Sequence, residues 1–419
     1  MSDIKKESIH LYIVQIANYL VPLITLPYLT STLTLNGMGK LGLAQSLFTI
    51  VQAFIDFGFT YTASRNVSLN INNKTIISKI YTNVQTARFL IFLVILLIGS
   101  IITFFSDINL QDKLLYLIVL LSGFSVVVMP LWIFNGLSKN SLIAKYIIFS
   151  KIISLVFIFL FVHSFNDYIV AFMILNSSLV LLGFPIYFYL KENNIVYKFN
   201  EINIGDISDY LRKGFNVFVG TFFSMSYTNF IPFVIKYFTS DYWVGVYVIV
   251  ERLMSVLRQM YMPLIQASYA KLCICVENKM KQEFNTIVKR ICLLFAGISM
   301  LAVIGNFVAG KYVIYFLLNN EQIAYKYTFL SMLICFVVAI SMILTYCYYL
   351  ARDLGGILKW IYLVAAFIFY AAMVVTIKMN WVSLSSIYLN ILLVEISIVI
   401  MQTIGIIYLR NKKSPLFEN

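Results

Sequence analysis

The chain has 419 residues, of which 61% are hydrophobic and only 12% are charged, with a net charge of +13. A soluble protein of this size keeps about a quarter of its residues charged, whereas here the apolar residues form runs of about 20, long enough to cross the hydrocarbon of a membrane as helices. A soluble globular fold is therefore excluded, and a transmembrane barrel is disfavoured because barrel strands alternate apolar and polar residues.

The apolar runs predict an all-α membrane protein with twelve transmembrane helices. Their approximate bounds are 9–33, 41–63, 84–105, 114–137, 143–163, 168–190, 213–238, 243–268, 291–316, 327–350, 357–377 and 384–409. The first run is too long for the core of a signal peptide and no small-residue cleavage site follows it, so we expect it to remain in the mature protein.

The basic residues predict the orientation of these helices. With the N-terminus placed inside, the inner segments and the helix ends beside them carry 21 of the 31 Lys and Arg residues, and the outer loops carry 4. Positive charge concentrates on the cytoplasmic side of membrane proteins. We therefore expect a multi-pass protein of the bacterial inner membrane with both termini in the cytoplasm. The net charge then reflects topology and needs no nucleic-acid partner.

The longest inner loop divides the chain into two sets of six helices. We expect an N-terminal lobe at 1–190, a cytoplasmic loop at 191–212, a C-terminal lobe at 213–410 and a tail at 411–419. A short internal repeat supports the division: Pro27, Gly39, Gln45 and Gln52 match Pro232, Gly245, Glu251 and Arg258 in spacing after the glycine. Halves with an even number of helices share one orientation in the membrane.

The same stretches resemble a known family. Pro27-Tyr28-Leu29, Gly37-x-Gly39, Ala44-Gln45, Asp56-Phe57-Gly58-Phe59 and Arg65 are similar to the start of a Wzx-type polysaccharide flippase. Residues 130–136, PLWIFNG, are similar to the Trp-x-Phe-Gln-Gly motif of that family, with Asn135 in place of Gln. The length, the span count and the basic inner loops agree along the whole chain.

This resemblance implies membership of the multidrug/oligosaccharidyl-lipid/polysaccharide exporter superfamily. It implies two six-helix lobes in a V around a central cavity, with the first two helices of each lobe lining it. The chain departs from the family at Ser31, where the family often has Arg four residues after the first Pro. Lys236, at the equivalent place in the second half, keeps a cation.

Ionisable side chains within the predicted spans indicate a candidate site, since each costs at least about 2.5–3.5 kcal/mol at mid-membrane. The deep ones are Asp56, Lys151, Glu251, Arg252, Arg258 and Glu395, whereas Lys236, Lys311 and Arg88 lie near span ends, where snorkelling to the headgroups accounts for them. Glu251 and Arg258 are seven residues apart and share a helix face. Two interpretations stay open: a Glu–Arg bridge that joins two helices, and a cationic site that binds an anion. Candidates for that cationic site are Arg258, Arg252, Lys236 and Arg88.

Uncharged polar residues and prolines complete the predicted cavity. The first two spans supply Gln15, Asn18, Gln45 and Gln52 as a polar wall, although any one of them can serve simply to join helices. Pro22, Pro27, Pro232 and Pro263 lie within lining helices and are candidate hinges, because proline removes a backbone donor. The alternative is that they only shape the packing.

These features predict a transporter rather than an enzyme. The chain has no phosphate-binding loop with Lys followed by Ser or Thr, and no catalytic constellation outside the membrane. Cys273-x-Cys275 with only His10 and His163 in the chain predicts no metal site. We expect no cofactor, and Asp56, Glu251 and Glu395 are candidates for coupling to H⁺ or Na⁺.

The leading hypothesis is a flippase for an undecaprenyl-pyrophosphate-linked oligosaccharide, used in O-antigen or capsule-type polysaccharide synthesis. Arginine suits a pyrophosphate because its planar fork donates two hydrogen bonds at once. The expected partners are this lipid-linked substrate, the bilayer, and the polymerase and chain-length proteins of the same pathway. The alternatives are a drug/cation antiporter of the same superfamily and, from another class, a membrane polysaccharide polymerase.

Overall fold

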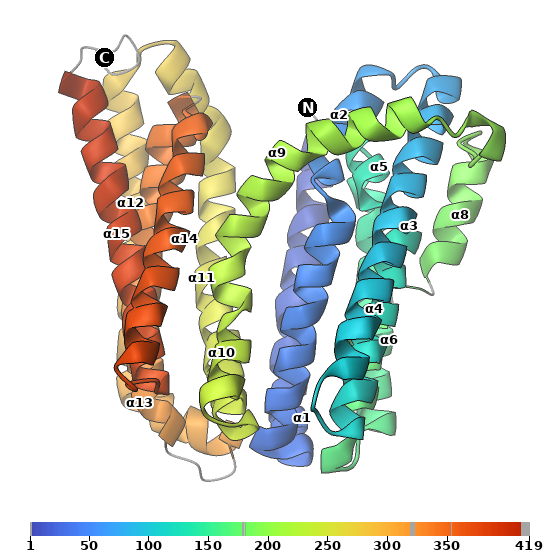
Figure 1. Ribbon diagram of the computed structural model, residues 1–419. Coiled ribbons are helices and arrows are strands. Elements are labelled where there is room, and N and C mark those ends of the chain that lie inside the picture. Colours follow the sequence, from blue (N-terminus) through green and yellow to red (C-terminus); the bar gives the residue numbers. More distant parts are fainter. Residues whose placement is uncertain (1, 178–179, 181, 319–322, 353, 412–419) are drawn as a thin grey trace. The chain divides into compact units, whose positions relative to one another are not determined.

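The computed structural model describes residues 2–177, 180, 182–318, 323–352 and 354–411. Within these ranges the side chains of residues 2–20, 22, 23, 140, 141, 177, 216, 224, 226, 227, 266, 267, 270, 317, 318, 323, 410 and 411 are not described. The described part of the chain is helical and has no strand (Figure 1). The prediction of an all-α protein is therefore confirmed.

The helices divide into two compact units, Met1–Pro232 and Phe233–Asn419. The helices of the first unit are α1 (Ser2–Asp56), α2 (Phe59–Leu69), α3 (Lys74–Phe105), α4 (Leu110–Val128), α5 (Leu131–Gly136), α6 (Asn140–Phe161), α7 (Tyr168–Ser177), α8 (Gly183–Glu192) and α9 (Ile204–Asn229). α10 (Ile231–Phe238) begins at the boundary. The second unit continues with α11 (Asp241–Glu277), α12 (Lys281–Leu318), α13 (Ile323–Ile343), a π-helix at Leu344–Tyr349, α14 (Gly355–Lys378) and α15 (Leu384–Asn411).

Eight helical segments of the described chain are long and apolar enough to cross a membrane, as a multi-pass membrane protein requires. They are Ile24–Leu69, Lys74–Phe105, Leu110–Gly136, Leu142–Phe161, Lys281–Phe316, Ala324–Arg352, Gly355–Lys378 and Leu384–Leu409. The first segment contains parts of two expected spans. Three expected spans, at about 168–190, 213–238 and 243–268, are not among the eight, so the count of twelve stays a prediction.

α1 is divided in two by a single residue. Thr34 has φ 61° and ψ 175°, while the helix continues on both sides of it. This backbone conformation is one that non-glycine residues rarely adopt. The first two expected spans are thus joined without the loop that the sequence suggested at 34–40.

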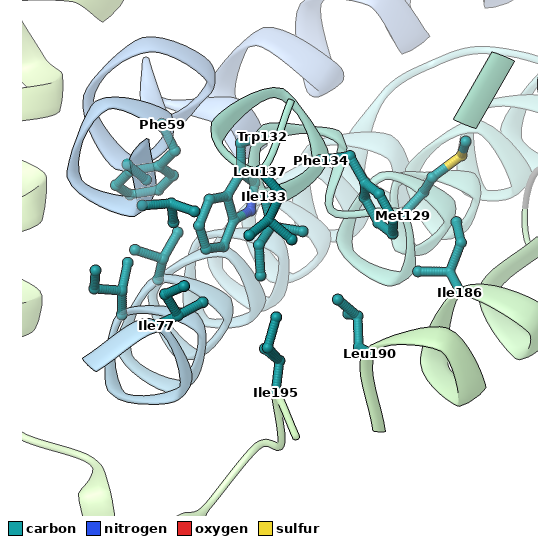
Figure 2. Packing of buried hydrophobic residues seen from close by; sticks show 14 of the residues in the cluster. Phe59, Ile77, Met129, Trp132, Ile133, Phe134, Leu137, Ile186, Leu190 and Ile195 are labelled. Atoms are coloured by element: carbon teal, nitrogen blue, oxygen red, sulfur yellow. The ribbon is translucent and has the colours of Figure 1, made fainter. Parts of the chain in front are cut away.

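The core of the first unit forms around the PLWIFNG segment. Trp132, Ile133 and Phe134 of α5 are completely buried (Figure 2). Their neighbours come from α2, α3, α8 and the segment after α8: Phe59, Ile77, Ile186, Leu190 and Ile195. The residues that carry the family resemblance in this segment therefore pack the core.

Hydroxyl groups and a glycine bring α5 close to α2. The Ser64 Oγ donates to the Trp132 carbonyl at 2.6 Å, and the Ser68 Oγ donates to the Gly136 carbonyl at 2.9 Å. A Cβ on Gly136 would lie 2.7 Å from the Ser64 carbonyl oxygen. Only glycine allows this approach of the two backbones.

The segment expected to form the loop between lobes belongs to the first unit. It runs along α3, where the Ser78 Oγ accepts from the Val196 N–H at 3.3 Å and the Thr82 Oγ1 accepts from the Lys198 N–H at 3.1 Å. The Asn83 Oδ1 accepts from the Asn203 N–H at 2.8 Å. α9 then begins at Ile204, inside the expected loop of 191–212.

Candidate functional site

The most central charged pair of the second unit lies within α11. Glu251 and Arg258 form a salt bridge in which the Arg258 Nη2 donates to the Glu251 Oε2 at 2.6 Å. Their side chains are 23% and 28% exposed. Two turns of helix separate the residues, so the bridge stays within one helix and joins no second one. Each side chain of the pair keeps part of its surface exposed, so a ligand can reach the pair.

An aromatic row packs beside this pair. Tyr247 on α11 contacts Tyr388 on α15 with ring centroids 5.7 Å apart, and Tyr388 stacks on Tyr327 of α13 at 5.8 Å. Tyr247 and Tyr388 are buried, and both lie close enough to Glu251 and Arg258 to interact electrostatically. These buried tyrosines therefore lie close to the Glu251–Arg258 pair.

The other cations of the second half have different surroundings. Lys236 on α10 forms an ion pair with Asp241, the first residue of α11. Arg252 is half-buried on α11, about 100° around the helix from Glu251. Glu395 is buried on α15 at 9% exposure. Lys236 and Arg258 thus each pair with a carboxylate.

Arg88 lies in the interior of the first unit. It is 2% exposed, and its guanidinium donates to the Gln85 Oε1 at 2.9 Å and to the Val126 carbonyl at 2.6 Å. The Gln85 Nε2 donates to the Val127 carbonyl at 2.8 Å. The sequence suggested a side chain that snorkels to the headgroups, but the guanidinium instead binds the end of α4.

Pro130 explains why these carbonyls need partners. In a continuous helix the Val126 carbonyl would accept from the N–H of residue 130, which proline lacks. The Leu131 N–H donates to the Met129 carbonyl instead of to Val127. Both carbonyls at the end of α4 are therefore left over, and Arg88 and Gln85 of α3 satisfy them.

The Asp56-Phe57-Gly58-Phe59 motif forms the turn between α1 and α2. The Asp56 Oδ1 accepts from the Thr60 Oγ1 at 2.6 Å, and its charge interacts with that of Arg88. Gly58 has φ +79°, and a Cβ on it would lie 2.8 Å from the Gly214 carbonyl oxygen. The motif thus positions Asp56 and brings the turn against α9.

The remaining predicted residues are placed as follows. Gln45 and Gln52 are half-buried on α1, whereas the side chains of Gln15, Asn18 and Pro22 lie outside the described residues. Pro27 and Pro263 lie inside α1 and α11. Pro232 is the second residue of α10, just after the helical conformation is interrupted at Phe230 between α9 and α10. Proline is well tolerated in the first turn of a helix.

Sequence reasoning missed Gln85 and the tyrosine row. Gln85 had a detectable signal, since it is a polar residue three positions before an intramembrane arginine, where two helical side chains meet. Tyr247 and Tyr388 had none, because the chain contains 29 tyrosines and nothing in the sequence separates these two from the others.

A family model and curated relatives match the chain. The model described as "Polysaccharide biosynthesis protein" matches residues 4–269. A protein named "Putative O-antigen transporter" from Escherichia coli (strain K12) is 24% identical over 272 residues, which cover 64% of this chain and 65% of that protein. A protein of the same name from Shigella dysenteriae is 22% identical over 273 residues, or 64% of this chain and 67% of that protein. The match thus spans 65% of the length of the Escherichia coli relative.

Solved structures with a similar fold come from transporters. The inward-facing conformation of a multidrug resistance MATE family transporter of the MOP superfamily has a TM-score of 0.65 at 15% identity, covering 97% of this chain and 99% of that chain. An outward-facing conformation has a TM-score of 0.59 at 13% identity, covering 99% and 97%. These similarities show the fold. Since the family model covers more than half of its length, this membrane protein belongs to the polysaccharide biosynthesis protein family, the one that its Wzx-type motifs resemble.

Proposed function

We propose that the protein is a flippase that carries an undecaprenyl-pyrophosphate-linked oligosaccharide from the cytoplasmic to the outer leaflet, for O-antigen or capsule-type polysaccharide. Family membership, the names of the two relatives and the transporter fold support this proposal. The observation that carries it is the partly exposed Glu251–Arg258 pair, near the middle of α11 and far from either end of that helix.

The chemistry of the pair suits a diphosphate headgroup. A guanidinium presents several donors in a plane and can bind two phosphate oxygens at once. Glu251 occupies this fork in the absence of an anion, so an arriving diphosphate competes with a carboxylate of the protein. Such an exchange keeps the Arg258 guanidinium paired at every stage, so this cation is never left without a counter-ion in the membrane. It also allows release, because Glu251 can take the guanidinium back.

Replacing both residues of the pair by uncharged ones is expected to lower export strongly without unfolding the protein. In Glu251→Gln/Arg258→Met no unpaired carboxylate remains, so the protein should accumulate in the membrane as the wild type does. Loss of charge-assisted hydrogen bonds to the substrate should lower export about tenfold or more. The measurement is surface polysaccharide in a strain that lacks its own O-antigen transporter and expresses this chain with the cognate glycan pathway.

The matched control removes an exposed bridge that joins the same helix, α11, to α12. Lys271 and Glu283 pair at 2.6 Å with side chains 61% and 36% exposed. Lys271→Met/Glu283→Gln should therefore leave export unchanged. Wild-type export by the Glu251/Arg258 double variant would refute the role of the pair.

A drug/cation antiporter is the second candidate, and the MATE transporter fold favours it. The two functions separate cleanly in a deletion strain. A flippase deletion removes surface polysaccharide and leaves drug susceptibility unchanged, whereas an antiporter deletion does the reverse.

Coupling to H⁺ or Na⁺ through Asp56, Glu251 or Glu395 also stays a proposal. The Asp56 carboxylate accepts a hydrogen bond from Thr60, and the Glu251 carboxylate accepts one from Arg258. Transport by reconstituted protein under an imposed gradient of each ion would identify the coupling ion. Equal rates with and without both gradients would remove coupling.

A further inference from the structure

Lys151 lies at the centre of a membrane-spanning helix. It is eleven residues after the start of α6 at Asn140 and ten residues before its end at Phe161. At 1.5 Å per residue, each end of the helix is about 15 Å away. This exceeds the reach of a lysine side chain, so Lys151 cannot bring its charge to the headgroups as lysines near helix ends do.

The face of α6 that carries Lys151 is turned toward protein. At about 100° per residue, Lys151 lies within about 20° of Ala144, Ile158 and Val162 around the helix. All three are buried, at 2%, 0% and 0% exposure. Lys145 lies about 120° away on the same wheel and is exposed. Lys151 itself is half-buried, so part of its side chain packs against protein.

The neighbour on that face is α1, with which α6 packs most extensively. The Tyr28 hydroxyl donates to the Val162 carbonyl at 2.7 Å, and the Tyr28 ring lies 4.6 Å from the Phe159 ring. These contacts join the end of α6 to α1, the helix that the family resemblance assigns to the lining of the cavity. The face of α6 that carries Lys151 is therefore turned toward the interior of the first unit.

No carboxylate neutralises this charge within the described part of the chain. None of the ion pairs of the described residues includes Lys151. Other cations of the first unit are satisfied: Lys40 pairs with Asp112 at 2.8 Å, and Arg88 donates to Gln85 and to the Val126 carbonyl. Lys151 differs from both.

We propose that Lys151 binds an anionic phosphate group of the transported molecule, as a contact of the first unit. The inference rests on the proposed function and extends it to a residue in the other half of the chain. An ammonium group held away from water is costly without a counter-ion. A phosphate supplies that counter-ion, and the ammonium offers it three donors. The bound phosphate is then the counter-ion of the Lys151 ammonium group.

The experiment uses inorganic pyrophosphate and purified full-length protein in detergent. Lys151→Met keeps the size of the side chain and removes its charge, Lys151→Arg keeps the charge, and Lys145→Met removes a charge from the exposed face of the same helix. We expect Lys151→Met to weaken pyrophosphate binding about tenfold or more, as the loss of a charge-assisted contact does. Lys151→Arg should stay within about threefold of wild type, and Lys145→Met should not change affinity.

A measurement on the wild-type protein covers the case in which Lys151→Met does not fold. A water-soluble amine-reactive reagent labels accessible lysines, and mass spectrometry reports each site. We expect pyrophosphate to protect Lys151 and to leave the labelling of Lys145 unchanged. Failure to label Lys151 at all, or labelling that pyrophosphate does not slow, would overturn the proposal.

The outcomes separate this proposal from the proposed function. If the wild type exports glycan and Lys151→Met binds pyrophosphate as the wild type does, the role of Lys151 fails and the flippase stands. If the wild type neither binds pyrophosphate nor restores surface polysaccharide, both fail.

Discussion

Arg88→Met is expected to destabilise the first unit by about 3 kcal/mol, because the Val126 carbonyl then has no donor in a region from which water is excluded. The variant loses both hydrogen bonds of the buried guanidinium, to Gln85 and to Val126. Thermal unfolding in detergent and the protein level in the membrane measure the effect. Lys74→Met, at the exposed start of the same helix α3, is the control and should behave as the wild type.

The cause can be tested by giving the carbonyl another donor. Pro130→Ala restores an N–H at the position that the Val126 carbonyl would use in a continuous helix. In the Pro130→Ala background, Arg88→Met should cost less than in the wild type, with a coupling of about 1–2 kcal/mol in the double-mutant cycle. Strictly additive effects would show that Arg88 stabilises the unit for some other reason.

The second large effect is expected at Gly214, where α9 meets the turn between α1 and α2. A Cβ at this position would lie 2.5 Å from the Phe57 carbonyl oxygen, which is backbone and cannot rotate away. Gly214→Ala should separate the two elements and disturb the stacking of Phe57 on Phe218, whose ring centroids are 4.8 Å apart. We expect a loss of about 3 kcal/mol, the upper end for overpacking.

Gly220→Ala is the matched control for this substitution. Gly220 lies on the same helix α9, and a Cβ there would meet nothing within 4 Å. Because alanine also favours the helix by about 1 kcal/mol over glycine, this variant should be as stable as the wild type or more so. Equal stability of the two alanine variants in the same thermal unfolding assay would mean that the close approach of α9 to the turn does not contribute to stability.

Hydropathy was sufficient to predict the helical membrane fold, because runs of about 20 apolar residues have few other uses. The position of the Glu251–Arg258 pair on one helix face also follows from spacing alone, since seven residues make two turns. The spacing could not predict which residue pairs with Glu251. The sequence left open whether Glu251 would bridge to another helix, and the structure shows that the bridge stays inside α11.

Arg88 shows a different limit of prediction. Its distance from the end of a span indicated snorkelling, but its environment is set by Pro130, which lies 42 residues away in the sequence. A long-range demand of this kind becomes visible only when α3 and α4 are side by side. The same holds for Gly58 and Gly214, whose glycines are required by a contact between distant segments and not by any local turn alone.

The polar side chains along one face of α3 have a practical consequence for dissecting the protein. The side chains of Ser78, Thr82 and Asn83 form hydrogen bonds with backbone groups of residues 194–203. That stretch is therefore part of the folded first unit and does not act as a flexible linker. A protease site or a fluorescent tag inserted there would disrupt the fold of the first unit.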